Sequence, residues 1–283
     1  MYHLFSPQTI LENFITLIHP FLDDPAQHED AHLKSAYRKF IAHYQPHTPI
    51  DDHTPLFISD DAYDHIIPQF FSNEAVFTDE HYAEFRQQDP PYQDKHIRAH
   101  ALQSALNSLK QQEEDLGFLF ELLVNKVISP TQPVPGFSAT NPKFQGIIFM
   151  MQDIIATERG LKELMVHEFT HTTLFLDERC HPYYTDYALL EQKENYIEAA
   201  ISGIFLPIDR SLHSTLVSTE IFLLRDKLLG HPTELDGHPP TEKILAKTRT
   251  TLQHIQNHPV TKTLFTKHAH ELLERCDAIL PAL

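Results

Sequence analysis

The stretch LMVHEFTHTTLFLDE, residues 164–178, forms the centre of the predicted fold. Its apolar residues surround His167, Glu168 and His171 at helical spacing, so the stretch predicts a largely buried α-helix. Because residues four apart on a helix lie one turn above each other, both imidazoles should project from one face. This is the HExxH pattern, in which two histidines hold a metal ion and the glutamate lies beside it. The stretch therefore predicts a metal site on a helix.

The residues before this stretch support that interpretation. Histidine is abundant, at 21 of 283 residues, so HExxH would arise by chance in about one shuffled sequence in ten. However, residues 146–151 (GIIFMM) are the best strand candidate in the chain, and Thr157 is suited to cap a following helix. Strand, cap and helix in this order favour a metal site. The alternative is a pair of core histidines bonded to backbone carbonyls.

The rest of the chain predicts a mainly α fold, a helical domain with a short β element before the HExxH helix. Ser6 and Pro7 are suited to open the first helix, and Gly230 to close a later one. We expect one domain over residues 1–283, with an N-terminal helical part (1–128), a metal-binding core (144–230) and C-terminal helices (240–279). Helical patterns cover residues 94–127 with a break at Gly117, then 187–204, 210–229, 240–257 and 260–279. Residues 46–76 and 129–142 are predicted to be irregular.

Composition limits the class of protein. The net charge of −17 argues against a partner with a phosphate backbone, so no nucleic acid is expected. No apolar run approaches the roughly 18 residues of a membrane-spanning helix, and the N-terminus lacks the pattern of a signal peptide. The two cysteines, Cys180 and Cys276, predict no disulfide framework. We therefore expect a cytoplasmic protein with no membrane partner.

A third metal ligand must come from outside the motif. A glycine three residues after the second histidine is typical of metzincin proteases, but Leu174 stands there, which excludes that class. Glu198, on the helix predicted for residues 187–204, would complete a set of two histidines and a glutamate. His213, in the first turns of a strongly apolar helix, is the other candidate. His268, in the C-terminal helix, is expected at the surface.

The span from Phe144 to Gly230 resembles the HExxH-type peptide β-hydroxylases of ribosomal peptide modification (RiPP biosynthesis). The resemblance is carried by residues 167–171, by Pro207, and by His213-Ser214 opening an apolar helix that ends in Arg225. It implies an oxygenase that uses iron(II), 2-oxoglutarate and O₂ on a peptide substrate, with His167, His171 and His213 as metal ligands.

The chain departs from the family pattern at one place that concerns the cosubstrate. The family has an arginine before the proline, where this chain has Leu206. The carboxylate of 2-oxoglutarate needs a cationic partner, preferably an arginine because of its bidentate geometry. Arg210 or Arg225 would then fill this role.

Two other functions fit the same motif. In a zinc metallopeptidase, Glu168 would be the general base for the attacking water, and Tyr183, Tyr184 or Tyr187 would stabilise the oxyanion. In a non-catalytic protein, the histidines would bind a metal without turnover or serve structure alone. Iron and zinc are not distinguished by ligand type here, since imidazole suits both.

Overall fold

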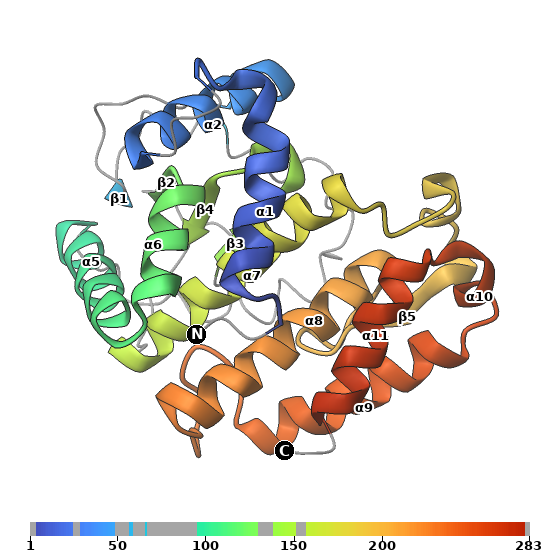
Figure 1. Cartoon of the computed structure of the whole chain (residues 1–283). Helices are drawn as coiled ribbons and strands as arrows, with labels where there is room; N and C mark the ends of the chain where they lie inside the picture. The colour runs from blue at the N-terminus through green and yellow to red at the C-terminus, as the bar shows by residue number, and fades with distance from the viewer. Residues whose placement is uncertain are drawn as a thin grey trace.

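The computed structural model describes residues 4–24, 29–48, 57–58, 66, 95–129, 138–150 and 157–280, and it is mainly α-helical, as predicted (Figure 1). Its helices are α1 (Pro7–Ile18), α2 (Asp30–Tyr44), α5 (Lys95–Gln112), α6 (Glu114–Leu123), α7 (Glu158–Cys180), α8 (Ile208–Leu224), α9 (Thr241–Asn257), α10 (Thr261–Leu264) and α11 (Lys267–Ile279). Its strands are β1 (Phe57–Ile58), β2 (Lys126–Ile128), β3 (Ser138–Thr140), β4 (Ile147–Met150), β5 (Tyr196–Glu198) and β6 (Phe205–Pro207). The irregular segment predicted for residues 46–76 lies mostly outside the described residues.

Local sequence signals set the helix ends. The Ser6 hydroxyl accepts a hydrogen bond from the Thr9 backbone N–H at 3.0 Å, and Pro7 occupies the first helical position of α1. Thr157 caps α7 in the same way, through the Gly160 backbone N–H. Gly230, at φ 71°, ends the helical turn Arg225–Leu229 that continues α8. These three predicted helix ends are confirmed.

A small mixed sheet has three of its strands, β2, β3 and β4, between α6 and α7 in the sequence. Among the described strands its order is β1-β2-β4-β3, in which β1, β2 and β4 are parallel and β3 pairs antiparallel with β4. In the register, Val127 and Ala139 face Ile148 and Phe149 on β4. The predicted β element before the HExxH helix is therefore β4, and its partner β3 is an outer strand of the described sheet.

Three sequence expectations about this part of the chain are wrong. The predicted break in the helical pattern falls at Glu113, between α5 and α6, and not at Gly117, which lies inside α6. A Cβ at Gly117 would overlap Lys110, so glycine allows α5 and α6 to approach closely. Val127 belongs to β2, because the chain turns extended at Val124. The segment 129–142 contains β3, so it is not an irregular loop throughout.

Two further helix predictions also need correction. Residues 187–204 form short 3₁₀ turns, strand β5 and the turn that joins β5 to β6 in an antiparallel hairpin. The turn is closed by the Ala199 and Ile204 backbones and by Gly203 at φ 71°. Residues 260–279 form two helices, α10 and α11, because the Thr266 hydroxyl caps a new helix at the Ala269 backbone N–H. In both places a turn residue overrides the helical spacing of the side chains.

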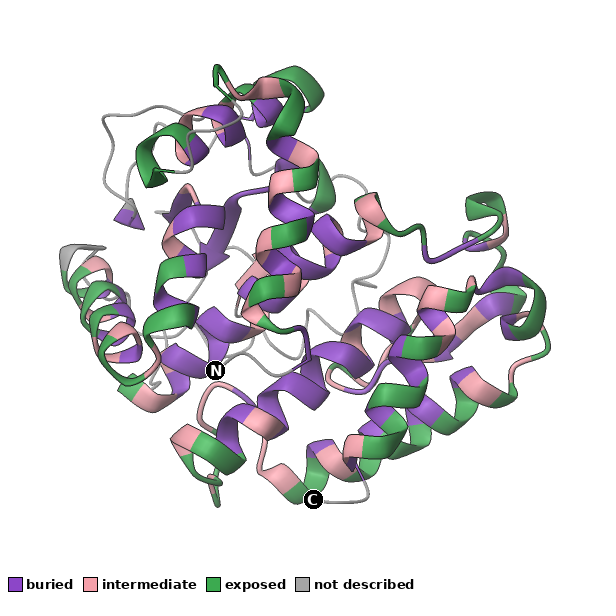
Figure 2. Cartoon of the chain, in the orientation of Figure 1, coloured by how far each residue is buried: buried purple, intermediate pink, exposed green. Residues whose placement is uncertain are grey.

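The long helix α7 runs through the middle of the fold and packs against α1, α5 and α8 (Figure 1). Buried residues line α7, α8 and the sheet, whereas α2, α5, α9 and α11 each turn one exposed side to solvent (Figure 2). Most of the buried apolar side chains in the described residues form one cluster, with members from Leu4 to Leu280. This packing holds α7 on several sides and leaves part of one face for its histidines.

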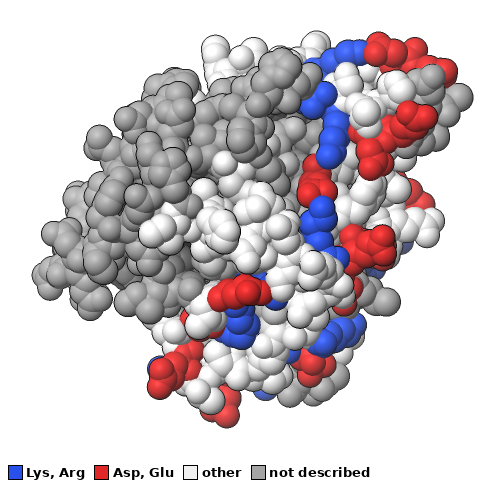
Figure 3. Space-filling model, turned by 90° about the vertical axis from the view of Figure 1, so that its left-hand side faces the viewer, with Lys and Arg blue, Asp and Glu red and all other residues white. Residues whose placement is uncertain are grey.

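Charges of both signs lie on the one face of the molecule that Figure 3 shows. On the face in Figure 3, acidic and basic side chains are interspersed over the described part of the molecule. The net charge of −17 is therefore not gathered there into one acidic area. Within the described ranges, no helix has the length and apolar character needed to span a membrane.

Candidate metal centre

The two motif histidines lie one turn apart on α7, with ring centres 5.1 Å apart. Two imidazoles that share a metal ion at about 2.0–2.1 Å have ring centres about 5 Å apart. Neighbours on the other faces of the helix are buried, whereas the His167 side chain stays 14% exposed and His171 is half-buried. The spacing and partial exposure of this pair suit a metal site that solutes can reach.

His213 reaches the same place from α8. Its ring centre lies 5.7 Å from that of His171 and 5.3 Å from that of Phe175, and its Nε2 is 3.8 Å from Glu178 Oε2. Helix packing between α7 and α8 therefore brings together His167, His171 and His213, the three residues named by the family resemblance.

The three rings lie in a row with His171 in the middle. Among the residues that the structure describes, no three His, Cys, Asp or Glu side chains converge closely enough to hold a metal ion as they stand. Three nitrogen donors are thus adjacent, and the His213 ring would have to turn towards the pair to complete a three-ligand site. The donor chemistry fits a metal ion, whereas the arrangement in this structure is that of separate neighbours.

The electrostatics of the two motif histidines favour neutral rings. Burial, together with the neighbouring His238 and His171, holds the pKa of His167 well below its usual value. Burial and the neighbouring His213 lower the pKa of His171 to about 3. Both imidazoles are therefore neutral at pH 7, which is the form that binds a metal ion.

The glutamate of the motif is oriented by the outer strand β3. Glu168 is buried, and its two carboxylate oxygens accept hydrogen bonds from Ser138 Oγ at 2.6 Å and from Thr140 Oγ1 at 3.0 Å. Its Oε1 also lies 3.7 Å from His167 Nε2. The carboxylate is thus held between β3 and the nitrogen that faces the centre of the site. Sequence reasoning missed both hydroxyl residues, because it placed them in a loop.

Glu198 lies elsewhere. It belongs to β5, where its backbone carbonyl accepts a hydrogen bond from Thr251 of α9. A cavity of about 240 Å³ beside it is lined by Glu198, Ala199, Ala246, Lys247, Thr250, Thr251 and His254. Of the two candidates for the third ligand, the fold therefore brings His213 to the histidine pair and directs Glu198 towards α9.

The two candidate arginines differ in their surroundings. Arg225 is fully buried; its Nε and Nη2 donate to the two oxygens of Glu163, each at 2.7 Å, and Nη1 donates to Thr241 Oγ1 at 3.0 Å. This guanidinium is committed to an ion pair, which corrects the expectation that it binds a cosubstrate. Arg210 is half-buried in the first turn of α8, three residues before His213.

His238 and Glu163 were not identified from the sequence. His238 Nε2 lies 2.8 Å from His167 Nδ1, and His238 Nδ1 lies 2.9 Å from Glu163 Oε1. Burial alone would raise the pKa of Glu163, but the hydrogen bonds from Arg225 and His238 outweigh it and lower the pKa to about 2. His238 lies 71 residues from His167, and no motif links the two.

The three candidate tyrosines also separate. The Tyr183 hydroxyl donates to Asp177 at 2.7 Å, and the Tyr187 hydroxyl donates to Glu178 at 2.8 Å. The Tyr184 hydroxyl is buried and has no hydrogen-bond partner among the described residues. Tyr187 is linked to the histidine row through Glu178, which lies 3.8 Å from His213 Nε2, whereas the Tyr183 ring lies 6.3 Å from that of His213.

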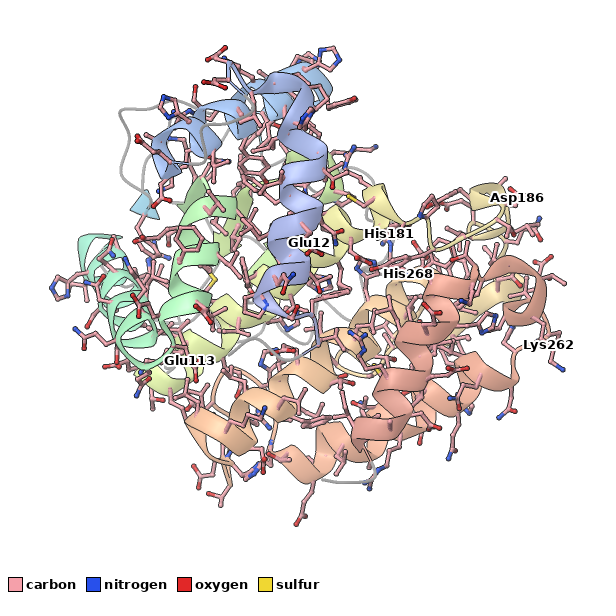
Figure 4. All side chains as sticks on the ribbon, in the orientation of Figure 1. Glu12, Glu113, His181, Asp186, Lys262 and His268 are labelled. Carbon is pink, nitrogen blue, oxygen red and sulfur yellow. The ribbon has the colours of Figure 1, made fainter. Side chains whose placement is uncertain are left out.

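Asp177 organises a second cluster near the end of α7. One of its oxygens accepts from Asn13 Nδ2 at 2.7 Å; the other accepts from the Tyr183 hydroxyl and lies 2.6 Å from His268 Nε2. The ring of His268 packs beside that of His181, with centres 4.8 Å apart (Figure 4). His268 therefore bonds to a buried carboxylate, although its side chain stays 30% exposed, so the expectation of a surface residue is only partly correct.

Comparison with known proteins gives no family to which the chain can be assigned. A scan against models of protein families finds no match, and no curated protein matches the chain. What the histidine row does must therefore be inferred from its own residues and neighbours.

Proposed function

We propose that the chain is an iron(II)- and 2-oxoglutarate-dependent oxygenase that hydroxylates a peptide, with His167, His171 and His213 as metal ligands. The observation that supports this most is the position of His213, whose ring lies 5.7 Å from His171 although the two residues come from different helices. Three imidazole nitrogens form a ligand set that iron(II) accepts. Bound iron(II), with 2-oxoglutarate and O₂, would supply the oxidising power.

The residues of the protein would hold the metal ion and keep water away from it. Phe175 packs on both His171 and His213, with ring centres 6.2 and 5.3 Å away. Such an apolar wall keeps water from one side of the site, as oxidation chemistry requires. Glu178, 3.8 Å from His213 Nε2, would orient that ring, as carboxylates commonly do for histidine ligands.

Arg210 is the proposed partner of the 2-oxoglutarate carboxylate. Residues three apart on a helix are neighbours on its surface, so Arg210 lies on the side of α8 that carries His213. Arg225 is excluded from this role because its fork already binds Glu163. Freeing Arg225 would take its two short hydrogen bonds from a buried carboxylate, which would keep only its contacts with His238 and Arg159.

Strand β3 is the proposed docking place of the peptide. Among the described strands it pairs only with β4, and its Ser138 and Thr140 hydroxyls reach Glu168 beside His167. An extended peptide can add to such an edge through backbone hydrogen bonds. A peptide bound there would pass next to the histidine row.

A zinc metallopeptidase is the second candidate, and one observation favours it. Glu168 Oε1 lies 3.7 Å from His167 Nε2, so the carboxylate is placed to accept a proton from an attacking water. Zinc would polarise that water and the scissile carbonyl. Under the oxygenase proposal, Glu168 would take no part in proton transfer and would only hold neighbouring residues of the site in place. A non-catalytic protein remains the third interpretation.

One experiment separates the three. The purified chain is loaded anaerobically with iron(II), then 2-oxoglutarate is added and the visible spectrum recorded, with His213→Ala and Glu198→Ala as paired variants. The oxygenase predicts a weak charge-transfer band that survives in Glu198→Ala and disappears in His213→Ala. No band, with stoichiometric zinc binding and a peptidase activity abolished by Glu168→Gln, would establish the peptidase. No band and no turnover with either metal would leave the non-catalytic interpretation.

A further inference from the structure

A hydrogen-bonded line of three side chains ends at the first motif histidine. Glu163 and His167 lie one turn apart on α7, and His238 is inserted between their polar atoms from the loop before α9. The two contacts measure 2.9 Å (Glu163 to His238) and 2.8 Å (His238 to His167). Glu163, Arg225 and His238 are each at most 4% exposed, so water does not compete for these contacts.

The backbone is built to bring His238 to this place. Asp236 accepts hydrogen bonds from the Thr157 backbone N–H at 3.0 Å and from the Thr157 hydroxyl at 2.6 Å, which fixes the loop to the start of α7. Gly237 has φ 77°, and a Cβ there would lie 2.9 Å from the Gly160 carbonyl oxygen. A Cβ on Gly160 would in turn overlap Asp236. Two glycines thus allow the close approach that positions His238.

The direction of the hydrogen bonds between Glu163, His238 and His167 follows from the charge of Glu163. Arg225 donates to both oxygens of Glu163, so Glu163 is a carboxylate and can only accept. His238 Nδ1 must therefore donate to Glu163. In a neutral His238 ring the other nitrogen, Nε2, then carries no proton and accepts from His167. With His238 in that form, His167 carries its proton on Nδ1, and its Nε2 is left with a free lone pair.

We infer that His238 is a positioning residue that holds His167 in the Nδ1–H form and aims Nε2 at the metal. The inference rests on the metal site of the proposed function. It gives the first motif histidine an outer partner of the kind that metal-bound histidines commonly have. The outer partner here is a second histidine, itself fixed by a buried ion pair.

The geometry separates this role from that of a ligand. A nitrogen–nitrogen distance of 2.8 Å is that of a hydrogen bond, and the His167 atom involved is Nδ1. The atom that faces Glu168 is the other nitrogen, Nε2, at 3.7 Å. His238 thus bonds to one nitrogen of His167, Nδ1, and leaves the other nitrogen, Nε2, on the side of Glu168 for the proposed metal ion.

Two substitutions at one position test the inference. In His238→Gln the side-chain carbonyl can still accept from His167 Nδ1–H, whereas His238→Leu has similar bulk and cannot accept. Cobalt(II) affinity is measured by chelator competition on the full chain. The ring tautomer of His167 is read in the metal-free protein from nitrogen–proton correlation spectra of ¹⁵N-histidine. Thermal melts verify that each variant folds.

The positioning role predicts that wild type and His238→Gln bind cobalt within about threefold of each other and that both show the Nδ1–H form. His238→Leu should bind about 10- to 100-fold more weakly and should show a mixture of tautomers. Unchanged affinity in His238→Leu would overturn the inference. Loss of metal from both variants would also overturn it, because His238 would then be a ligand.

The proposed metal centre and the positioning role of His238 are overturned by different results. Wild-type protein that binds no metal would overturn the proposed centre, and the positioning role with it. Wild-type protein that binds metal, but shows His167 protonated on Nε2 in the metal-free spectrum, would overturn the positioning role alone. If His238→Leu does not fold, the wild-type spectrum and His238→Gln still decide the question.

Discussion

The middle of α7 and its two ends differ in how completely their polar groups are paired. Near the start, Glu163 is paired with Arg225 and His238; near the end, Asp177 is paired with Asn13, Tyr183 and His268. In between, His171 touches the rings of His167, Phe175 and His213, and its nitrogens have no hydrogen-bond partner among the described residues. His171 thus differs from the paired carboxylates at the two ends, and under the proposed function its nitrogens are the ones that would bind the metal ion.

The comparison predicts its largest effect at the Asp177 end. Asp177→Ala would leave the Asn13 amide, the Tyr183 hydroxyl and the His268 ring without their shared acceptor. We expect the free energy of unfolding to fall by about 4 kcal/mol, measured by urea denaturation with and without added metal. The loss should be the same in both conditions.

The matched control is Asp277→Ala, which removes an exposed aspartate of α11 and should leave the unfolding midpoint unchanged. An Asp177→Ala protein as stable as wild type would show that the paired network does not hold the end of α7. The contrast between ends and middle would then be lost.

The Glu163 end predicts a pH-dependent effect. Its folded pKa, about 2, lies below the ordinary value of 4.5. Its contribution is therefore fully present above pH 4.5 and is lost as the pH falls towards 2. Glu163→Gln should thus be less stable than wild type by about 3 kcal/mol at pH 7, and the gap should close in acid. Denaturant unfolding at several pH values measures it. A gap that stays constant with pH would contradict the ionised pair.

For His171, in the middle of α7, we predict a loss of stability that appears only when metal is present, unlike that of Asp177→Ala. Without metal, His171→Ala should unfold close to wild type, because no hydrogen bond of its ring is lost. With metal at 100 times its dissociation constant, wild type should gain about 2.7 kcal/mol and the variant nothing. Thermal melts with and without iron(II) or zinc measure this.

For this prediction the control is His100→Ala, an exposed histidine on α5 that should keep the full metal-dependent gain. If His171→Ala were as destabilised without metal as Asp177→Ala, the middle of α7 would be a structural cluster like its ends.

The smallest predicted effect compares two members of the same network, Asp177 and His268. The His268 side chain is 30% exposed, so water can replace it at Asp177 once it is removed. His268→Ala should therefore cost only about 1 kcal/mol, well below Asp177→Ala. Equal losses from the two variants would mean that the network acts as a single unit. Urea unfolding of both proteins side by side resolves the difference.

Several features of the fold and site were predictable because they depend on residues close together in the chain. The helix caps at Ser6 and Thr157 and the closing Gly230 need only a few neighbours. The common face of His167 and His171 follows from four-residue spacing alone. Where turn chemistry competed with apolar spacing, as in residues 187–204, the helical pattern was misleading, because the hairpin is set by Gly203 and by pairing between β5 and β6.

The sequence by itself determined that α7 is a helix with two imidazoles on one face, because helical periodicity is a property of the local chain. Only the tertiary structure decided that His213 lies against His171 and that Glu198 faces α9. It also decided that Arg225 is buried with Glu163 and that His238 reaches His167 across 71 residues. Such contacts depend on how helices pack and where two glycines let a loop approach, and no spacing along the chain records that.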